Sequence, residues 1–455
     1  MRNEEFRKAV QWLRSIFTQR STLSAQRSIL KIITAIFIVQ GTIMAATLMH
    51  VTVKGVKIPV VFEKEKRLPL ASMELVFRDS GSLADTVPGI ARFSAGILGE
   101  GTRKEGAIAF AEALENRAVQ LHADTGRETF VLSLEALKSE FDFGLGKLSE
   151  LLRDPNLTPE AFKKVQTQTL GKLRQKESDF DYIAATKLRS ILFEGTPLAH
   201  PALGTPESIS HLKLEQVESY LKDHLHLENL IVVIGGKFTP EEVKKAVEKA
   251  AEALTHGEVA PIPHFSANDK EREVVTPEET DQAYIYFGAP YAMEANDTHR
   301  VYGKVAAFIL GSGGFGSRLM EEVRVKRGLA YSAYGRLAVQ RTHSYFSGYL
   351  QTKLESQKEA QKVVKEVVDR FLKGGVSAEE LESAKKFFLG SEPLRTETLS
   401  QRMSRAFHEY YDGLGLEWSA KELEMIRTMK LEDLNAFIHA HPEIGKLSWS
   451  IVTKK

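Results

Sequence analysis

Two side chains in the second half of the sequence have the chemistry to act together on a peptide bond. Arg324 and Tyr331 stand seven residues apart, on either side of Arg327-Gly328-Leu329. A guanidinium and a phenol that converge on one point can donate hydrogen bonds to a carbonyl oxygen and to the oxyanion that develops from it. Spacing alone is weak evidence for catalysis, because most residues so spaced are a solvated charge and a half-buried ring.

A glycine cluster precedes this pair, at residues 311–316 of the stretch GSGGFGSRLMEEVRVKRGLAYSAY (311–334). It could be read as a phosphate-binding loop, but no Gly-Lys-Ser/Thr follows it and no strand–turn–helix context surrounds it. We therefore expect a flexible loop that enters a helix. The stretch predicts a glycine-rich turn, a short charged helix and then a strand that begins near Gly328.

The familiar metal and nucleophile motifs do not occur in the sequence. It contains neither His-Glu-x-x-His nor the inverted form His-x-x-Glu-His, and no Gly-x-Ser-x-Gly. Two histidine pairs, His224 with His226 and His439 with His441, could each line one face of an extended segment, but no third zinc ligand accompanies them. Because the chain has no cysteine, disulfides, thiolate catalysis and cysteine-ligated metals are excluded.

Length and charge set the broad class of the protein. A chain of 455 residues exceeds the usual size of one hydrophobic core, so we expect two or more domains. Its 61 Lys and Arg residues nearly balance 60 Asp and Glu residues, which leaves a net charge of +1. No overall basic field attracts nucleic acid, and we set nucleic-acid binding aside.

Residues 1–50 form a basic N-terminal segment followed by a predicted signal peptide or membrane anchor. Seven basic and two acidic residues in positions 1–31 precede a charge-free run of 22 residues, Ile32 to Val53. As a helix, that run would span a hydrocarbon core about 30 Å thick. Three interpretations stay open: an uncleaved signal anchor, a secretory signal cut near Met44-Ala45-Ala46, and a core strand after a disordered tail.

The remainder of the chain predicts two α/β domains, at residues 51–255 and 276–455, joined by a proline-containing linker at 256–275. Strands are expected within 51–64, 72–78, 128–134, 230–236, 273–275, 283–287 and 344–352. Helices are expected at 88–98, 108–116, 141–152, after Thr158-Pro159-Glu160, after Thr239-Pro240-Glu241, at 297–310, at 355–373 and after Ser377.

The two domains show a repeat with one constant spacing. Four identical or similar residues recur 219 positions later within one predicted helix: Thr158 and Ser377, Glu160 and Glu379, Leu170 and Leu389, Gly171 and Gly390. One such match is chance, but four in one helix indicate a duplicated α/β domain.

On these motifs the chain resembles the pitrilysin/insulinase family of zinc peptidases, which includes the mitochondrial processing peptidases. The likeness rests on SRLM (317–320), EVR (322–324), RGLAYS (327–332) and HLENL (226–230), and it extends over roughly residues 52–455. The resemblance implies an α+β fold of two homologous domains. Each would be a sandwich of mixed sheet and helices, and together they would form half of a clam-shell chamber.

In that family, the first domain carries His-x-x-Glu-His on a helix that begins Gly-Leu-Ala-His-Phe, with a distal Glu as the third zinc ligand. The matching stretch here is GIARFSAG, residues 89–96. Arg92 and Gly96 stand at the two His positions, Ala95 at the general base and Lys172 at the distal Glu. The resemblance thus implies no zinc in this chain, since Ala and Gly lack lone pairs and Arg and Lys bring positive charge.

The Arg–Tyr half of the family's active site persists. Two-domain members divide that site between a zinc-bearing subunit and a subunit with this pair. The resemblance implies that Arg324 and Tyr331 polarise the scissile carbonyl in trans, while a zinc-bearing homologous partner supplies metal and water. Gly313, Gly314 and Gly316 of the glycine-rich loop would contact substrate at the chamber entrance.

The expected function is that of a zinc-free subunit of a heterodimeric metalloendopeptidase, inactive alone, that acts on peptides or unfolded protein segments. The alternative is a non-catalytic structural or peptide-binding protein of the same fold in an envelope complex, as family members in a respiratory complex are. An enzyme that works alone through a relocated metal has no His/carboxylate cluster to support it. We expect a bacterial cell-envelope location, periplasmic or anchored in the inner membrane, with the mitochondrion as the alternative.

Overall fold

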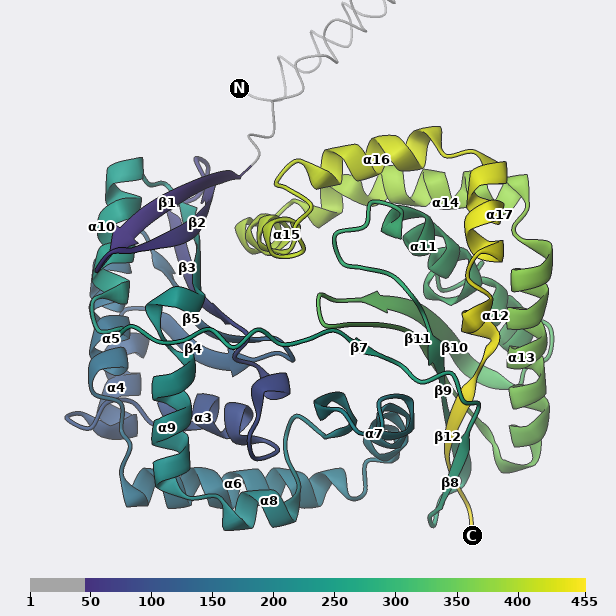
Figure 1. Cartoon of the computed structure of the whole chain (residues 1–455), viewed down its shortest axis with the longest axis horizontal. Helices are drawn as coiled ribbons and strands as arrows, with labels where there is room; N and C mark the ends of the chain where they lie inside the picture. The colour runs from purple at the N-terminus through teal and green to yellow at the C-terminus, as the bar shows by residue number, and fades with distance from the viewer. Residues whose placement is uncertain (1–45) are drawn as a thin grey trace, which may run out of the picture. The chain divides into compact units, whose positions relative to one another are not determined.

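A computed structural model describes residues 46–455, which form one compact unit. Within it, two mixed β-sheets are covered by helices (Figure 1), so the predicted α+β class is confirmed. The end of the charge-free N-terminal run forms strand β1 (Thr47–Val53), and the rest of the predicted signal or anchor lies outside the described residues. Among residues 46–455, no helix is both long and apolar enough to cross a membrane.

The first sheet has the strand order β1-β2-β6-β3-β5-β4. Strands β2 and β6 pair in parallel, and the other neighbours pair antiparallel. Its further strands are β2 (Val56–Lys64), β3 (Leu70–Arg78), β4 (Gln120–Thr125), β5 (Thr129–Leu137) and β6 (Leu230–Gly236). The helices of this half are α3 (Ile90–Leu98), α4 (Gly106–Glu115), α5 (Phe141–Arg153), α6 (Pro159–Lys176), α7 (Phe180–Leu192), α8 (Pro206–His211), α9 (Leu214–His224) and α10 (Pro240–Ala251).

The second sheet has the order β10-β11-β9-β12-β8, with β7 paired to β11. Its strands are β7 (Phe265–Ser266), β8 (Glu273–Pro277), β9 (Gln282–Pro290), β10 (Ala330–Val339), β11 (His343–Lys353) and β12 (Ser448–Thr453). The helices are α11 (Arg300–Ala307), α12 (Arg318–Met320), α13 (Gln357–Gly374), α14 (Ala378–Ser391), α15 (Leu399–Tyr411), α16 (Trp418–Thr428) and α17 (Leu431–His439). The predicted linker region thus contains β7 and the start of β8.

The two sheets share one topology. The series β2-β6-β3-β5-β4 corresponds to β8-β12-β9-β11-β10, and the parallel pair stands at the same end of each series. The repeated helix starts also match the sequence prediction. Thr158 accepts a hydrogen bond from the backbone N–H of Ala161, and Ser377 accepts one from Glu380, so both residues cap helices. Domain duplication is therefore visible in the strand order as well as in the sequence spacing.

Helices α7 and α15 are exchanged between the halves. They lie 219 residues apart, at the same offset as the sequence repeat. Helix α7 of the first half packs on β9 and β12 of the second sheet, whereas α15 of the second half packs on β2 and β6 of the first (Figure 1). Each half therefore completes the hydrophobic packing of the other.

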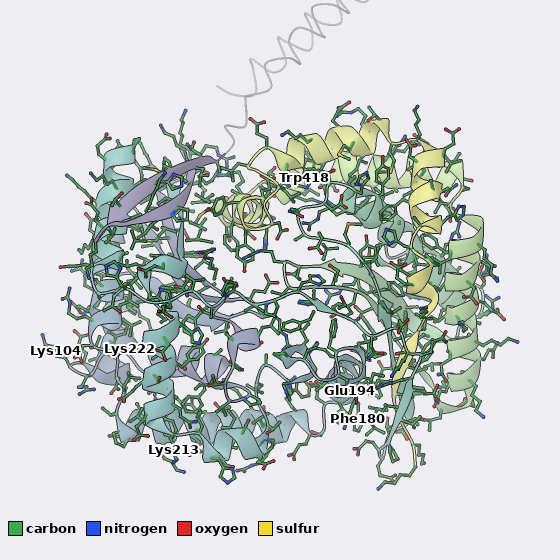
Figure 2. All side chains as sticks on the ribbon, viewed as in Figure 1. Lys104, Phe180, Glu194, Lys213, Lys222 and Trp418 are labelled. Atoms are coloured by element: carbon green, nitrogen blue, oxygen red, sulfur yellow. The ribbon has the colours of Figure 1, made fainter. Side chains whose placement is uncertain are left out.

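A glycine on each sheet makes room for the exchanged helix. A Cβ on Gly288 of β9 would lie 2.8 Å from a methyl group of Leu192, and one on Gly235 of β6 would overlap Met403. The ends of the α7 segment, labelled in Figure 2, are also tied to the second half. Phe180 packs edge-on against Tyr284, and Glu194 pairs with Arg272 at 2.6 Å.

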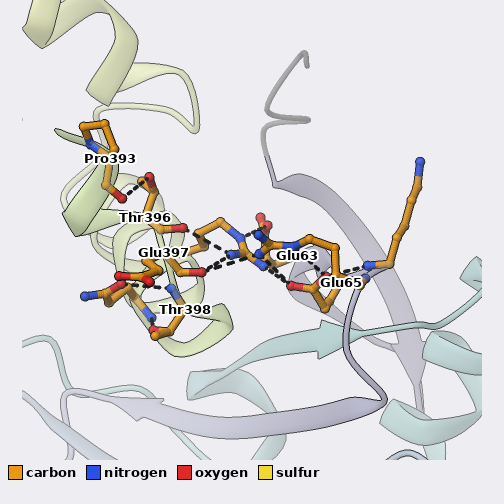
Figure 3. Close-up of polar contacts among 10 residues, drawn as sticks. Glu63, Glu65, Pro393, Thr396, Glu397 and Thr398 are labelled. Atoms are coloured by element: carbon orange, nitrogen blue, oxygen red, sulfur yellow. Dashed lines mark hydrogen bonds and ion pairs between the residues drawn. The ribbon is translucent and has the colours of Figure 1, made fainter. Parts of the chain in front are cut away.

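Beside the apolar contacts of α15 lies a buried ion cluster (Figure 3). The Arg402 guanidinium donates to Glu63 at 2.8 Å and to Glu65 at 2.6 Å, and all three side chains are nearly inaccessible to solvent. Hydrogen bonds from Arg67 and then from Arg402 lower the pKa of Glu65 to about 2, whereas burial raises the pKa of Glu63. Arg402 thus compensates two buried carboxylates of the other half of the chain.

Arg402→Ala should lower the free energy of unfolding by about 3–5 kcal/mol, because it leaves two buried carboxylates without their shared cation. Urea unfolding measures the change. Arg153→Ala is the control, since Arg153 and its partner Glu252 are 58% and 64% exposed, and its loss should cost at most about 1 kcal/mol. Equal effects of the two substitutions would contradict the structural role given to Arg402.

Candidate functional site

Arg324 and Tyr331 come together at the start of β10. Arg324 lies in a π-helical turn, Glu321–Val325, and Tyr331 is the second residue of the strand. The guanidinium carbon of Arg324 is 4.3 Å from the centre of the Tyr331 ring and 4.6 Å from the centre of the Phe315 ring. Cation–π attraction of this kind is worth about 0.5–1 kcal/mol at exposed sites, enough to orient the guanidinium.

The polar groups of this pair are available to a ligand. Within residues 46–455, neither the Arg324 guanidinium nor the Tyr331 hydroxyl forms a hydrogen bond or an ion pair. The nearby carboxylate of Glu322 is already engaged by Lys326, at 2.9 Å, and by Arg327. The Tyr331 side chain is 81% exposed. The Tyr331 hydroxyl therefore faces solvent beside the half-buried Arg324 guanidinium, and neither has an acceptor among the described residues.

Surrounding contacts fix the position of the pair. Arg318 makes a bidentate contact with Glu380 of α14, at 2.6 and 2.8 Å, and donates to the carbonyl of Gly375 at 2.8 Å. These bonds hold α12, which leads directly into the turn with Arg324. Thus Arg318 and Glu322 of the sequence motif stabilise the fold, and Arg324 is the charged residue left free. π-Helical turns are rare and frequently occur at functional sites.

The glycine-rich loop has structural reasons for its composition. Gly314 and Gly316 have φ angles of +64° and +102°, which L-residues with side chains rarely adopt. A Cβ on Gly313 would lie 2.7 Å from the carbonyl oxygen of Phe308. The predicted contact of these glycines with substrate stays a prediction. Sequence reasoning missed Phe315, whose ring is 70% exposed and contacts Arg324; the only signal was an aromatic residue among glycines.

The four positions that match the family's zinc site do not fit a zinc ion. Arg92 and Gly96 lie one turn apart on the exposed face of α3, and Lys172 is exposed on α6, which packs against α3. Arg92 pairs with Asp124 of β4, while the Ala95 methyl group is buried. The site therefore presents two cations and no metal-binding lone pair on these positions. Nor do the residues of 46–455 contain a His/Asp/Glu cluster suited to a metal.

A cavity of about 780 Å³ between the two sheets was not predicted from the sequence. Residues from the β4–β5 turn, α7, α11, β10, β11 and α15 line it, but neither the Arg324–Tyr331 pair nor the four zinc-site positions do. Its charged wall combines Arg127, Arg189 and Arg336 from distant parts of the chain. Such a set has no local sequence signal, because it exists only once the helices are exchanged.

Comparisons with known proteins agree on one family. Residues 60–206 match the family described as Insulinase (Peptidase family M16), and residues 211–388 match Peptidase M16 inactive domain. The "Non-peptidase homolog YmxG" of Helicobacter pylori is 42% identical over 91% of this chain and 96% of its own.

Solved structures give the same fold at lower identity. A peptidase M16 inactive domain from Pseudomonas fluorescens has a TM-score of 0.83 with 22% identity, covering 90% of this chain and 98% of its own. A protease from Helicobacter pylori has a TM-score of 0.79 with 16% identity, covering 90% and 100% respectively.

Glu322→Gln should destabilise the protein in a pH-dependent way. Hydrogen bonds from Lys326 and then Arg327 lower the pKa of Glu322 from 4.5 to about 2. This stabilisation is complete above the unfolded pKa and is lost as the pH falls through 2. The substitution should cost about 1–2 kcal/mol at pH 7, after allowance for solvent screening, and progressively less towards pH 2. Urea unfolding between pH 7 and pH 2 measures this cost in free energy of unfolding. Glu382→Gln is the control, because the Glu382 carboxylate is 59% exposed beside Lys385, and a cost independent of pH would contradict the assignment.

The purified chain should retain no stoichiometric zinc after exposure to the metal and gel filtration, because Arg92 and Lys172 oppose a divalent cation and Ala95 and Gly96 cannot ligate one. Elemental analysis gives the zinc content. A control variant, His224→Ala with His226→Ala, separates adventitious binding at that histidine pair. One equivalent of zinc that persists in this variant would contradict the conclusion.

Proposed function

Because the chain belongs to the M16 (insulinase) peptidase family, we propose that it is the zinc-free subunit of a heterodimeric metalloendopeptidase. In this proposal, Arg324 and Tyr331 act on the substrate carbonyl, and a zinc-bearing homologous partner supplies the metal and its water. Substrates are peptides or unfolded protein segments. The chain does not cleave peptides by itself.

The observation that carries the proposal is the pair of free donors at the start of β10. An exposed guanidinium normally finds a carboxylate neighbour or turns into solvent. Here Arg324 is held against the rings of Tyr331 and Phe315, with its N–H groups unused by residues 46–455. An oxyanion site needs donors that are already in position and have no other acceptor. Such donors need little reorganisation free energy when negative charge develops on the substrate oxygen.

The chemistry assigned to this chain is binding and polarisation. The Tyr331 O–H and an Arg324 N–H donate to the carbonyl oxygen of the scissile peptide bond and draw electron density from its carbon. When water adds to that carbon, the oxygen becomes an oxyanion, and the same two bonds strengthen because they are then charge-assisted. Docking of a partner over this exposed surface would exclude water and increase the effect.

A second candidate is a non-catalytic peptide-binding or structural protein. The 42% identical relative is named a non-peptidase homolog, which favours this candidate. The exposed rings of Phe315 and Tyr331, with the half-buried Arg324 between them, would then form a contact surface for another chain, of the aromatic and arginine type common at interfaces. The two candidates differ in one observable: only the first predicts hydrolysis by a mixed complex that neither chain shows alone.

The cellular setting is part of the proposal. We place the protein in the bacterial cell envelope on the strength of its basic N-terminal segment and the charge-free run that follows. The partner and the substrate would meet this chain there. Membrane fractionation of the native protein, followed by identification of whatever co-purifies in equal amount, tests the location and the partner together.

In the mixed complex, Arg324→Ala and Tyr331→Phe should each lower kcat by about 10²-fold, the scale for loss of one oxyanion donor. Steady-state cleavage of a fluorogenic peptide gives kcat and KM separately. The matched controls are Arg153→Ala and Tyr349→Phe, which remove an exposed arginine and a tyrosine of the adjacent strand β11. They should leave kcat unchanged.

Complex formation must be measured for the same variants by size-exclusion chromatography. If both active-site variants assemble and cleave as the unsubstituted chain does, the catalytic role is wrong. If no zinc-bearing homologue gives a mixed complex with activity, the peptide-binding candidate replaces the first.

A further inference from the structure

The cavity between the sheets carries an excess of positive charge. Five Arg and Lys side chains line it, against the two carboxylates of Glu128 and Glu422. Both carboxylates are already engaged. Glu422 pairs with Lys304 at 2.5 Å, and Glu128 accepts hydrogen bonds from the backbone N–H and the hydroxyl of Thr342, at 2.8 and 2.6 Å.

Three of the cavity's cations lack a carboxylate partner. Arg300 is neutralised by Asp412 at 2.7 Å, and Lys304 by Glu422. By contrast, Arg127, Arg189 and Arg336 form no ion pair within the part of the chain that the structure describes. Arg127 donates only to neutral oxygens, of which the His200 carbonyl at 3.1 Å is the nearer. We call these three residues the cavity arginines.

Two of the cavity arginines repel each other in a partly buried place. Burial first, and then the charge of Arg189, lower the pKa of Arg127 to about 10, which leaves it protonated at neutral pH. Burial and the same two guanidiniums lower the pKa of neighbouring His343 to about 4, so this imidazole is neutral. Like charges held together away from solvent cost free energy, and a bound anion would relieve that cost.

The cavity also exposes a sheet edge. Among the strands of residues 46–455, β10 is the last of its sheet and pairs only with β11. Residues 336–339 of β10 line the cavity without a gap, so residues of both alternating side-chain directions contribute. In a strand that lined a cavity with one face, only every second residue would appear. The edge of β10, with its unpaired backbone groups, therefore borders the cavity, as an extended peptide would require for strand addition.

We propose that this cavity binds an acidic peptide segment in extended conformation. Its backbone adds to the edge of β10, and its Asp or Glu side chains reach the cavity arginines. The volume of about 780 Å³ lies within the roughly 300–1,000 Å³ usual for ligand sites. This inference goes beyond the proposed function and does not depend on it, because the cavity is lined by neither Arg324 nor Tyr331.

Fluorescence anisotropy with the full chain alone, without any partner, tests the inference. The probe is a labelled ten-residue peptide with three glutamates and an amidated C-terminus. One comparison peptide replaces glutamate by glutamine, and another keeps these glutamines but has a free C-terminal carboxylate. The acidic peptide should bind at least about tenfold more tightly than the glutamine peptide, and the difference should shrink at high salt. If only the free C-terminus restores binding, the site recognises chain ends and the assignment to acidic side chains is overturned.

Arg189→Gln and Arg336→Gln should each weaken binding of the acidic peptide by about tenfold, because each removes one charge-assisted contact. Arg153→Gln removes an equal charge from an exposed position outside the cavity and should change binding little. Thermal unfolding confirms that each variant is folded. A second readout is the His343 imidazole proton in NMR titrations, since a carboxylate beside it should raise the low pKa. Equal binding by all three variants, with no change at His343, would overturn the proposal.

Discussion

The exchange of α7 and α15 between the two halves is the constraint on which the rest of the structure depends. Each helix covers the sheet of the other half, and Arg402 on α15 meets two buried carboxylates of β2 and the residue that follows it. A buried cation shared in this way contributes little net stability compared with an apolar contact, but its removal is costly. A different placement of α15 would therefore leave these charges unpaired. The same docking creates the cavity, because α7 contributes Arg189 and α15 contributes Tyr411 to its wall.

The four zinc-site positions and the Arg324–Tyr331 pair differ in what they offer a ligand. At the zinc positions, Arg92 is paired with Asp124 on the surface, and Ala95 has become part of the core. At the start of β10, in contrast, the fold holds Arg324 beside Tyr331, and no acceptor within residues 46–455 takes a hydrogen bond from either polar group. Surface ion pairs stabilise little, so the Arg92–Asp124 pair adds little to stability, while the Arg92 cation opposes a metal ion at this position. The retained pair is the feature that connects the fold with a proposed role in trans.

Local patterns in the sequence predicted much of the secondary structure. Alternation predicted β2, β3 and β5, and the N-caps Thr158 and Ser377 gave the start of α6 and α14. The helix predicted at 297–310 is instead α11 followed by a π-helical turn, Phe308–Ser312, where Gly311 approaches Gly335 of β10 too closely for a side chain. Helix α15 was not predicted at all, although its offset from α7 follows the repeat.

The candidate site was predictable only where its residues are close in sequence. Arg324 and Tyr331 are seven residues apart, and the family motif marks them. Phe315 lies outside that motif, and its contact with Arg324 depends on the conformation of the glycine-rich loop. The cavity arginines come from a turn, an exchanged helix and an edge strand. Their proximity follows from tertiary structure, which periodicity and spacing do not encode.

The proposed function requires that Tyr331 contacts the substrate of a mixed complex. A photo-reactive phenylalanine analogue placed at Tyr331, with the same analogue at the exposed Leu394 as control, tests this contact directly. With a zinc-bearing homologue present, we expect a cross-link from position 331 to the peptide at its cleavage site, and none from position 394. Cross-links from position 331 that never include the peptide, or that are identical for the two positions, would contradict it.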